Sequence, residues 1–151
     1  MRIGIVSDTH GELPQGVLDA LQGAEKIIHA GDVGGQWILD ELAEIAPVVA
    51  VRGNMDSGDL GWRLPERLLV PAGDDRILVQ HTIERVRAGG IPSDARIVVI
   101  GHTHRPRIEW QGDVLYVNPG SAGGHNRDGS GPTVALLELA AGGAQASIIA
   151  I

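Results

Sequence analysis

Seven aspartate, asparagine and histidine side chains follow closely on short apolar runs of this sequence, and together they could bind metal. They are Asp8, His10, Asp32, Asn54, His81, His102 and His104. They offer imidazole nitrogens, carboxylate oxygens and an amide oxygen, without thiolate because the chain has no cysteine. Such donors suit Mn²⁺, Fe²⁺, Co²⁺, Ni²⁺ or Zn²⁺ better than Mg²⁺ or Ca²⁺. We expect two divalent transition metal ions per chain, with Mn²⁺ the first choice.

The placement of these residues matters more than their number. In open α/β sheets, ligands bind beyond the carboxyl ends of the strands, so distant residues converge on one cleft when their strands are neighbours. Asp8 with His10, and His102 with His104, are pairs two residues apart. On an extended segment, side chains at this spacing point to the same side, so we expect the two members of each pair to bind metal together.

Each of these motifs alone is weak evidence for a metal site. An Asp-x-His or Gly-Asp turn often arises by chance, and a structural residue is the commoner explanation. The His-x-His pair after Gly101 is more specific, because two neighbouring imidazoles have no routine structural role. All five motifs, each after its own apolar run, indicate a metal centre.

A pair of such ions predicts a particular chemistry. Two ions about 3.5–4 Å apart can generate a bridging hydroxide, hold phosphate oxygens and offset charge in an in-line displacement. The ligand types therefore predict hydrolysis of a phosphoric ester.

Several short, β-branched apolar runs bounded by glycine and polar turns predict the strands that position these residues. They cover Ile3–Val6, Ile27–Ile28, Val48–Val51, Ile77–Val79 and Ile97–Ile100. Helix-like segments near Gln15–Gln22 and Gln36–Ile45 separate the first three runs. The chain should therefore open as β-α-β-α-β, with a parallel sheet and right-handed crossovers.

The second half of the chain has a different pattern, which predicts three antiparallel hairpins. The pairs are Leu68–Val70 with Ile77–Val79, Ile108–Trp110 with Val114–Val117, and Val134–Leu139 with Ala146–Ile151. We predict an α/β fold, a mixed two-sheet β-sandwich flanked by helices. The glycine-rich segment Gly120–Gly131 should form one functional or mobile loop.

Composition limits the size and the partners of the protein. The 151 residues fit one domain, 1–151, whose core must be built from Ile, Val, Leu and Ala because Phe is absent. A net charge of -7 with a single lysine, Lys26, argues against a broad nucleic-acid-binding surface. The N-terminal run is too short for a secretory signal, and no stretch approaches a membrane span, so we expect a cytoplasmic protein without a membrane partner.

In these motifs the chain resembles the calcineurin-like metallophosphoesterases, and more closely their small bacterial and archaeal phosphodiesterase branch. The matching motifs are Asp8-Thr9-His10, Gly31-Asp32, Gly53-Asn54, His81, Gly101-His102-Thr103-His104 and Asn118-Pro119-Gly120-Ser121. The resemblance implies the calcineurin-like fold and a catalytic set identical to the seven metal ligands. It implies one metal held by Asp8, His10, Asp32 and His104, and another held by Asp32, Asn54, His81 and His102. Asp32 would bridge the two.

Two positions depart from the family pattern. Many relatives have a histidine directly after the Gly-Asn asparagine, where it helps to bind phosphate and to protonate the leaving group. This chain has Met55 there, followed by Asp56, and methionine cannot donate that proton. The common His-Gly-His is replaced by His81-Thr82-Ile83, which lacks the second histidine.

Other polar and aromatic residues have less specific interpretations. His29 lies within a strand and should be a core residue or a support behind the ligands. Arg127, in the glycine-rich loop with His125, is a candidate for contact with a substrate phosphate, as is Asn54. Trp62 is more typical of a packing or subunit contact than of a base-stacking platform, which leaves a homo-oligomer open.

The leading hypothesis is a metal-dependent phosphodiesterase acting on a small phosphodiester or nucleotide-like substrate. A phosphomonoesterase or protein phosphatase is disfavoured by Met55 and by the short chain. A nuclease would need a basic channel or a cap domain. A non-catalytic scaffold is the alternative from a different class, since one subunit of the eukaryotic retromer coat resembles this fold, but the complete ligand set argues against it.

Overall fold

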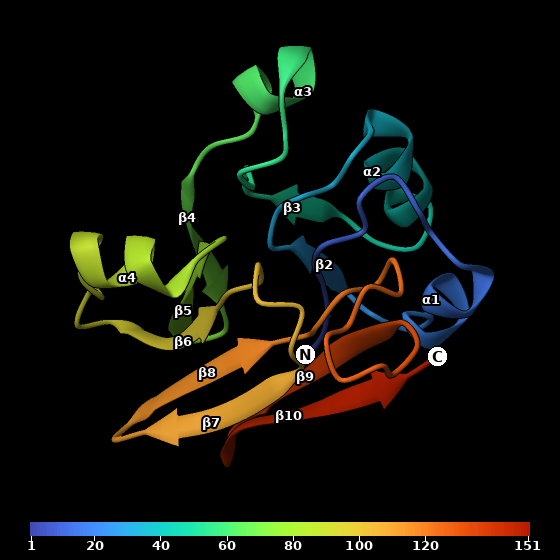
Figure 1. Cartoon of the computed structure of the whole chain (residues 1–151). Coiled ribbons are helices and arrows are strands. Elements are labelled where there is room, and N and C mark those ends of the chain that lie inside the picture. The colour runs from blue at the N-terminus through green and yellow to red at the C-terminus, as the bar shows by residue number, and fades with distance from the viewer.

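The computed structural model describes residues 1–151 and contains ten strands and four short helices (Figure 1). The first half contains β1 (Arg2–Val6), α1 (Gln15–Ala20), β2 (Lys26–His29), α2 (Gln36–Ala43), β3 (Val48–Ala50) and α3 (Gly58–Arg63). The second half contains β4 (Arg67–Ala72), β5 (Asp75–Gln80), α4 (Ile83–Gly89), β6 (Ala95–Val99), β7 (Arg107–Gln111), β8 (Val114–Asn118), β9 (Thr133–Ala140) and β10 (Gly143–Ala150).

The strands form two mixed sheets of five strands each. The first has the order β10-β9-β1-β2-β3, in which β1, β2 and β3 are parallel, β9 is antiparallel to β1, and β10 is antiparallel to β9. The second has the order β4-β5-β6-β8-β7, with β5, β6 and β8 parallel and an antiparallel strand at each edge. The predicted two-sheet α/β sandwich is therefore confirmed.

Successive side chains of a strand point to opposite faces of its sheet, so apolar strands contribute both to the core between the sheets and to the layers under the helices. Ile3 and Ile5 of β1, like Ile77 and Val79 of β5, lie in the core between the sheets. The intervening residues face outward, where α1 and α2 cover the first sheet and α4 covers the second (Figure 1). At Gly4, an added Cβ would lie 2.5 Å from Leu21, so glycine allows the segment after α1 to pack closely on the sheet.

Two of the helices, α3 and α4, were not predicted from the sequence. The N-cap of α4 is Thr82, whose hydroxyl accepts a hydrogen bond from the Arg85 amide, and its C-cap is Gly90, with φ of 75°. These are ordinary capping signals, but a seven-residue helix shows little apolar periodicity. Because α4 links β5 to β6, those strands are parallel, and the second sheet is not built from hairpins alone. No helix is long and apolar enough to cross a membrane.

His29 of β2 is the only fully buried histidine apart from the candidate metal ligands. Its Nδ1 accepts from the Gly31 amide at 3.2 Å, and its Nε2 lies 3.0 Å from the Thr9 hydroxyl, which itself donates to the Val33 carbonyl at 2.7 Å. His29 thus joins the loop after β1 to the loop after β2. Burial lowers its pKa from 6.5 to about 4.

We expect this imidazole to make the unfolding of metal-free protein sensitive to acid. The folded chain keeps His29 neutral down to about pH 4, whereas the unfolded chain protonates it near 6.5. Between these values the unfolded state binds more protons, so stability falls as the pH falls, by roughly 3 kcal/mol in all. Urea unfolding of wild type and His29→Gln, in chelator at several pH values, would measure this. The difference between the two should change across that window, and parallel curves would contradict the assignment.

Candidate metal centre

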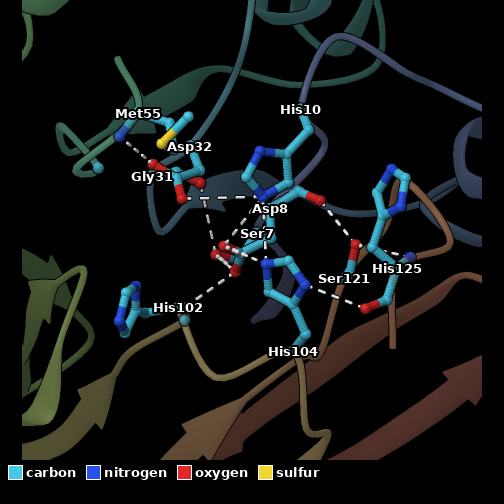
Figure 2. A network of polar contacts seen from close by, with 12 residues as sticks. Ser7, Asp8, His10, Gly31, Asp32, Met55, His102, His104, Ser121 and His125 are labelled. Atoms are coloured by element: carbon cyan, nitrogen blue, oxygen red, sulfur yellow. Dashed lines mark hydrogen bonds and ion pairs between the residues drawn. The ribbon is translucent and has the colours of Figure 1, made fainter. Parts of the chain in front are cut away.

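The loops that leave the strands of both sheets bring the predicted residues together. Figure 2 shows Asp8, His10, Asp32, His102 and His104 close to one another. Two groups of three possible ligands result, one from Asp8, His10 and His104, and one from Asp32, His81 and His102. Within each group the ligand atoms lie within 4.8 Å of one another. Asp8, Asp32 and His81 are buried, whereas His102 is exposed to solvent.

Asp32 and Asn54 connect the two groups and complete the set. Asp32 Oδ2 lies 3.2 Å from His81 Nε2 and 3.7 Å from His10 Nε2, so it stands between the groups. Asn54 Oδ1 lies 3.0 Å from His81 Nε2 and 3.1 Å from His102 Nδ1, which places it in the second group. The structure therefore brings all seven predicted residues together.

The backbone at these residues is unusual. The only residues other than glycine with positive φ are five of the seven candidates, Asp8, His10, Asp32, His102 and His104, with φ between 48° and 71°. The expectation of extended i,i+2 pairs is therefore wrong. Left-handed turns direct His102 and His104 into different groups, so they do not grip one metal together. Such conformations cost roughly 1–3 kcal/mol each and persist mainly at functional sites.

Glycines before the ligands let the loops approach one another. A Cβ at Gly53 would collide with the Asp32 carboxylate and amide, and a Cβ at Gly101 would collide with the Ser7 hydroxyl. The Gly-Asn and Gly-His motifs thus have a steric cause. A side chain at Gly53 would push apart the loops that follow β2 and β3 of the first sheet, and one at Gly101 would push apart the loops that follow β1 and β6 of the two sheets.

The carboxylate of Asp8 has an unpaired oxygen in the centre of the site. Its Oδ2 accepts hydrogen bonds from the Ser7 hydroxyl at 2.6 Å and from the His102 amide at 3.0 Å. Its Oδ1 is the only buried side-chain nitrogen or oxygen without a hydrogen-bond partner. Imidazole nitrogens of His104 and His10 lie 3.2 and 3.6 Å from it. A buried anionic oxygen among imidazole nitrogens is a suitable ligand for a cation.

Two histidines are oriented by backbone carbonyls, so that their Nε2 atoms face the other candidate ligands. His81 Nδ1 lies 2.6 Å from the Ala30 carbonyl, and His104 Nδ1 lies 3.0 Å from the His125 carbonyl. Because a carbonyl only accepts, each Nδ1 carries the proton, and in the neutral ring Nε2 keeps its lone pair. This second hydrogen bond is the usual arrangement of a metal-binding histidine. The donor set therefore fits divalent transition ions.

When no metal is bound, Asp8 and the histidines around it stabilise each other's charged forms, the carboxylate as an anion and the imidazoles as cations. Burial raises the pKa of Asp8, but His10, Ser7 and His81 outweigh it and leave the pKa below its ordinary value. The Asp8 carboxylate raises the pKa of His10 despite burial. Burial lowers the pKa of His81, but Asp32 and Asp8 more than offset it, so this pKa is raised. Metal ions must displace these protons, so metal binding should weaken as the pH falls.

Asp56 is a functional residue that the sequence interpretation missed. Its Oδ2 accepts from the amides of Asp32 at 3.0 Å and Gly53 at 2.9 Å, and its Oδ1 accepts from Val33 at 2.9 Å and Gly34 at 3.3 Å. One carboxylate thus ties the Asp32 loop to the Asn54 loop. The only signal in the sequence was an acidic residue two positions after Asn54.

The glycine-rich segment Gly120–Gly131 is anchored to the site at several points. Asn126 accepts from the Ser121 amide at 2.7 Å and donates to the Gly131 carbonyl at 3.0 Å, and the Ser121 hydroxyl donates to the Asp8 carbonyl at 2.7 Å. Arg127 donates its Nε–H to the Thr103 carbonyl at 3.1 Å, so in this structure it supports the metal-binding loop.

Replacing Asp56 by alanine should loosen the second group of ligands. Four amides would lose their acceptor, and the Asp32 and Asn54 loops would separate. We expect the affinity for the metal at Asp32, His81 and His102 to fall about 10–100-fold, the usual effect of losing a group that orients metal ligands. Calorimetric metal titration with circular dichroism would measure this. Asp59→Ala, an exposed acid in α3, serves as the control. Unchanged titrations of well-folded Asp56→Ala would show that the clamp is dispensable.

Comparisons with known proteins agree with this geometry. The model of the calcineurin-like phosphoesterase superfamily domain matches residues 1–142. A probable metallophosphoesterase from Methanothermobacter thermautotrophicus is 37% identical over 133 residues, which cover 80% of this chain and 77% of that protein.

Two solved structures share the fold across nearly the whole chain. A novel archaeal phosphodiesterase superposes with a TM-score of 0.80 at 24% identity, covering 99% of this chain and 100% of its own. A single mutant of Vps29 from Entamoeba histolytica superposes with a TM-score of 0.77 at 23% identity, covering 100% and 99%. On the extent of the family match and the identity to the methanogen protein, this chain belongs to the calcineurin-like phosphoesterase superfamily.

Proposed function

We propose that the chain is a divalent-metal-dependent phosphodiesterase that hydrolyses small phosphodiesters, including nucleotide-like ones. Its two metal ions would be held by Asp8, His10, Asp32 and His104, and by Asp32, Asn54, His81 and His102. Mn²⁺ is our first choice among Mn²⁺, Fe²⁺, Co²⁺, Ni²⁺ and Zn²⁺, all of which suit these donors. Membership of the phosphoesterase superfamily supports the reaction class.

The observation that carries the proposal is the pair of ligand groups joined by Asp32, with the unpaired Asp8 oxygen inside one of them. Six side chains from four loops converge there, and all of them are types that bind transition metals. A structural salt-bridge cluster would not need an orphaned carboxylate oxygen or five left-handed residues.

Some residues of the site would hold the metal ions, and others would face the incoming phosphate. When bound, the metals supply Lewis-acid activation of water and positive charge that offsets the phosphate. Asp8, Asp32 and His81 are almost wholly buried, so they fix the ligand geometry and exclude water from behind. Asn54 and His102 are exposed, so a phosphate reaches the centre from their side. Arg127 is proposed to contact that phosphate after leaving the Thr103 carbonyl.

The preference for diesters follows from Met55. This residue is 65% exposed, and its backbone amide donates to Asp32 Oδ1 at 2.8 Å, so it lies at the rim of the centre. Its side chain offers neither a proton for the leaving group nor a charge for a monoester's second negative charge. The phosphodiesterase among the structural neighbours agrees with this proposal.

Metal content is the first test of the proposal. Protein purified without chelator and supplemented with Mn²⁺ should carry two ions per chain by elemental analysis. Asp32→Ala should carry fewer and lose activity by orders of magnitude, because both groups lose a ligand. Asp40→Ala, which removes an exposed carboxylate from α2, should behave like wild type. A metal-free wild type whose hydrolysis survives chelation would refute the dinuclear centre, and stoichiometric metal without any esterase activity would favour the scaffold alternative.

The second test concerns Met55 and the pH profile. Wild type should hydrolyse activated aryl diesters in preference to monoesters, with a rate that rises with pH to a plateau. Met55→His should add a proton donor at the rim, which raises monoesterase relative to diesterase activity. It should also add a descending limb as the imidazolium, with an ordinary pKa of about 6.5, loses its proton.

Both activities would be assayed from pH 5 to 9 at equal metal content. Met55→Gln, similar in length but unable to donate a titrating proton, is the matched control. If wild type already prefers monoesters, the argument from position 55 fails. If the ratio in Met55→His does not change, the leaving-group proton comes from elsewhere.

A further inference from the structure

A second cleft lies behind the loop that carries His102 and His104, on the outer face of the second sheet. It has a volume of about 240 Å³ and is lined by residues of α4, β7 and β8 and of the segment between β6 and β7. Thr103 contributes to its wall, but none of the seven candidate metal ligands does. Thr103 Oγ1 accepts from Asn118 at 3.0 Å, so its hydroxyl is turned toward the sheet and the cleft. The cleft is therefore separate from the metal centre.

Three arginines line this cleft, in a protein whose net charge is -7. They are Arg87 of α4, Arg105 of the loop before β7, and Arg107 of β7. The only acidic residue in the wall is Glu109, which pairs with Arg107 at 2.9 Å. The cleft is therefore a local positive site on an acidic molecule.

The two remaining arginines are exceptional within the chain. Nine of the eleven arginines make a hydrogen bond or ion pair through the guanidinium, and the two without one are Arg87 and Arg105. Both of them line this one cleft. Each guanidinium therefore has its full set of donors available to a ligand.

The rest of the wall defines the shape of that ligand. Ile83, Ile100 and Tyr116 form an apolar side, and all three are partly buried. An aromatic ring beside two isoleucines suits a flat, partly apolar body. Two free guanidiniums suit a phosphate with two negative charges, because each presents a fork that matches phosphate oxygens.

We propose that this cleft binds a small organic phosphate monoester, a ring-containing body carrying a dianionic phosphate. The apolar wall takes the ring, and Arg87 and Arg105 take the phosphate. The site needs neither the metals nor hydrolysis, so it stands apart from the proposed phosphodiesterase activity.

Adenosine monophosphate serves as the probe in calorimetric titrations of Zn²⁺-loaded protein. The double variant Arg87→Gln/Arg105→Gln should weaken binding about 100-fold, or about tenfold for each arginine, because each loses a charge-assisted contact. The control Arg2→Gln/Arg96→Gln removes the same charge from exposed arginines outside the cleft and should leave affinity within about twofold. Adenosine and inorganic phosphate should each bind at least tenfold more weakly than the nucleotide. Any binding at the metal centre persists in both double variants, so only the difference reports the cleft.

Equal affinity of wild type and the Arg87→Gln/Arg105→Gln variant would overturn the proposal, as would equal weakening by the control pair, which would indicate a general charge effect. Inorganic phosphate binding as tightly as the nucleotide would overturn the organic part of the assignment. Because all four arginine side chains are wholly or partly exposed, circular dichroism should show native folding in both double variants. The single variants Arg87→Gln and Arg105→Gln give the same test with half the charge change.

Discussion

The wholly buried carboxylate of Asp8 is the interaction on which the site depends. One of its oxygens accepts from Ser7 in the first sheet's loop and from the His102 amide in the second sheet's loop. It thereby joins the carboxyl ends of β1 and β6 across the sandwich. Its other oxygen has no hydrogen-bond partner. A buried anionic oxygen costs several kcal/mol unless positive charge lies beside it, and here imidazole nitrogens of His10, His81 and His104 lie 3.2–3.9 Å away. The site around Asp8 therefore requires positive charge at this point, which the protonated rings of His10 and His81 supply when no metal is bound.

The strained backbone has the same origin. Parallel strands end at a common edge, but their side chains meet only if the chain turns sharply just after each strand, and this explains the left-handed φ values at Asp8, Asp32 and His102. Gly53 and Gly101 remove the side chains that would block this approach. The strain is offset by hydrogen bonds that surround the ligands, among them the four amides on Asp56 and the contacts of Asn118 with Gly101, Thr103 and Gly120. These supports lie on loops, so the metal-binding geometry is built by the loops on a rigid two-sheet base.

Much of the fold and the membership of the site could be predicted, because the strands are short apolar runs and the ligands follow them directly. Ile3–Val6, Val48–Val51 and Ile97–Ile100 correspond to observed strands within one or two residues. Helices α3 and α4 could not be recognised, since six or seven residues carry too little periodicity, and with α4 missed the parallel pairing of β5 with β6 was missed as well. Left-handed turns at His102 and His104 have no signature in residue type, so their division between two groups came only from the family resemblance. Asp56 and the arginines of the outer cleft depend on long-range contacts, which sequence spacing does not encode.

We propose that two ligand groups sharing Asp32 hold two transition metal ions. Anomalous diffraction from crystals grown with Mn²⁺, recorded on both sides of the manganese absorption edge, tests it directly because the peaks locate the metal itself. We predict two peaks about 3.5–4 Å apart, one beside Asp8 Oδ1, His10 and His104, and one beside His81, His102 and Asn54, with Asp32 between them. The absence of peaks at saturating Mn²⁺, or a single peak away from Asp8 and Asp32, would contradict the account.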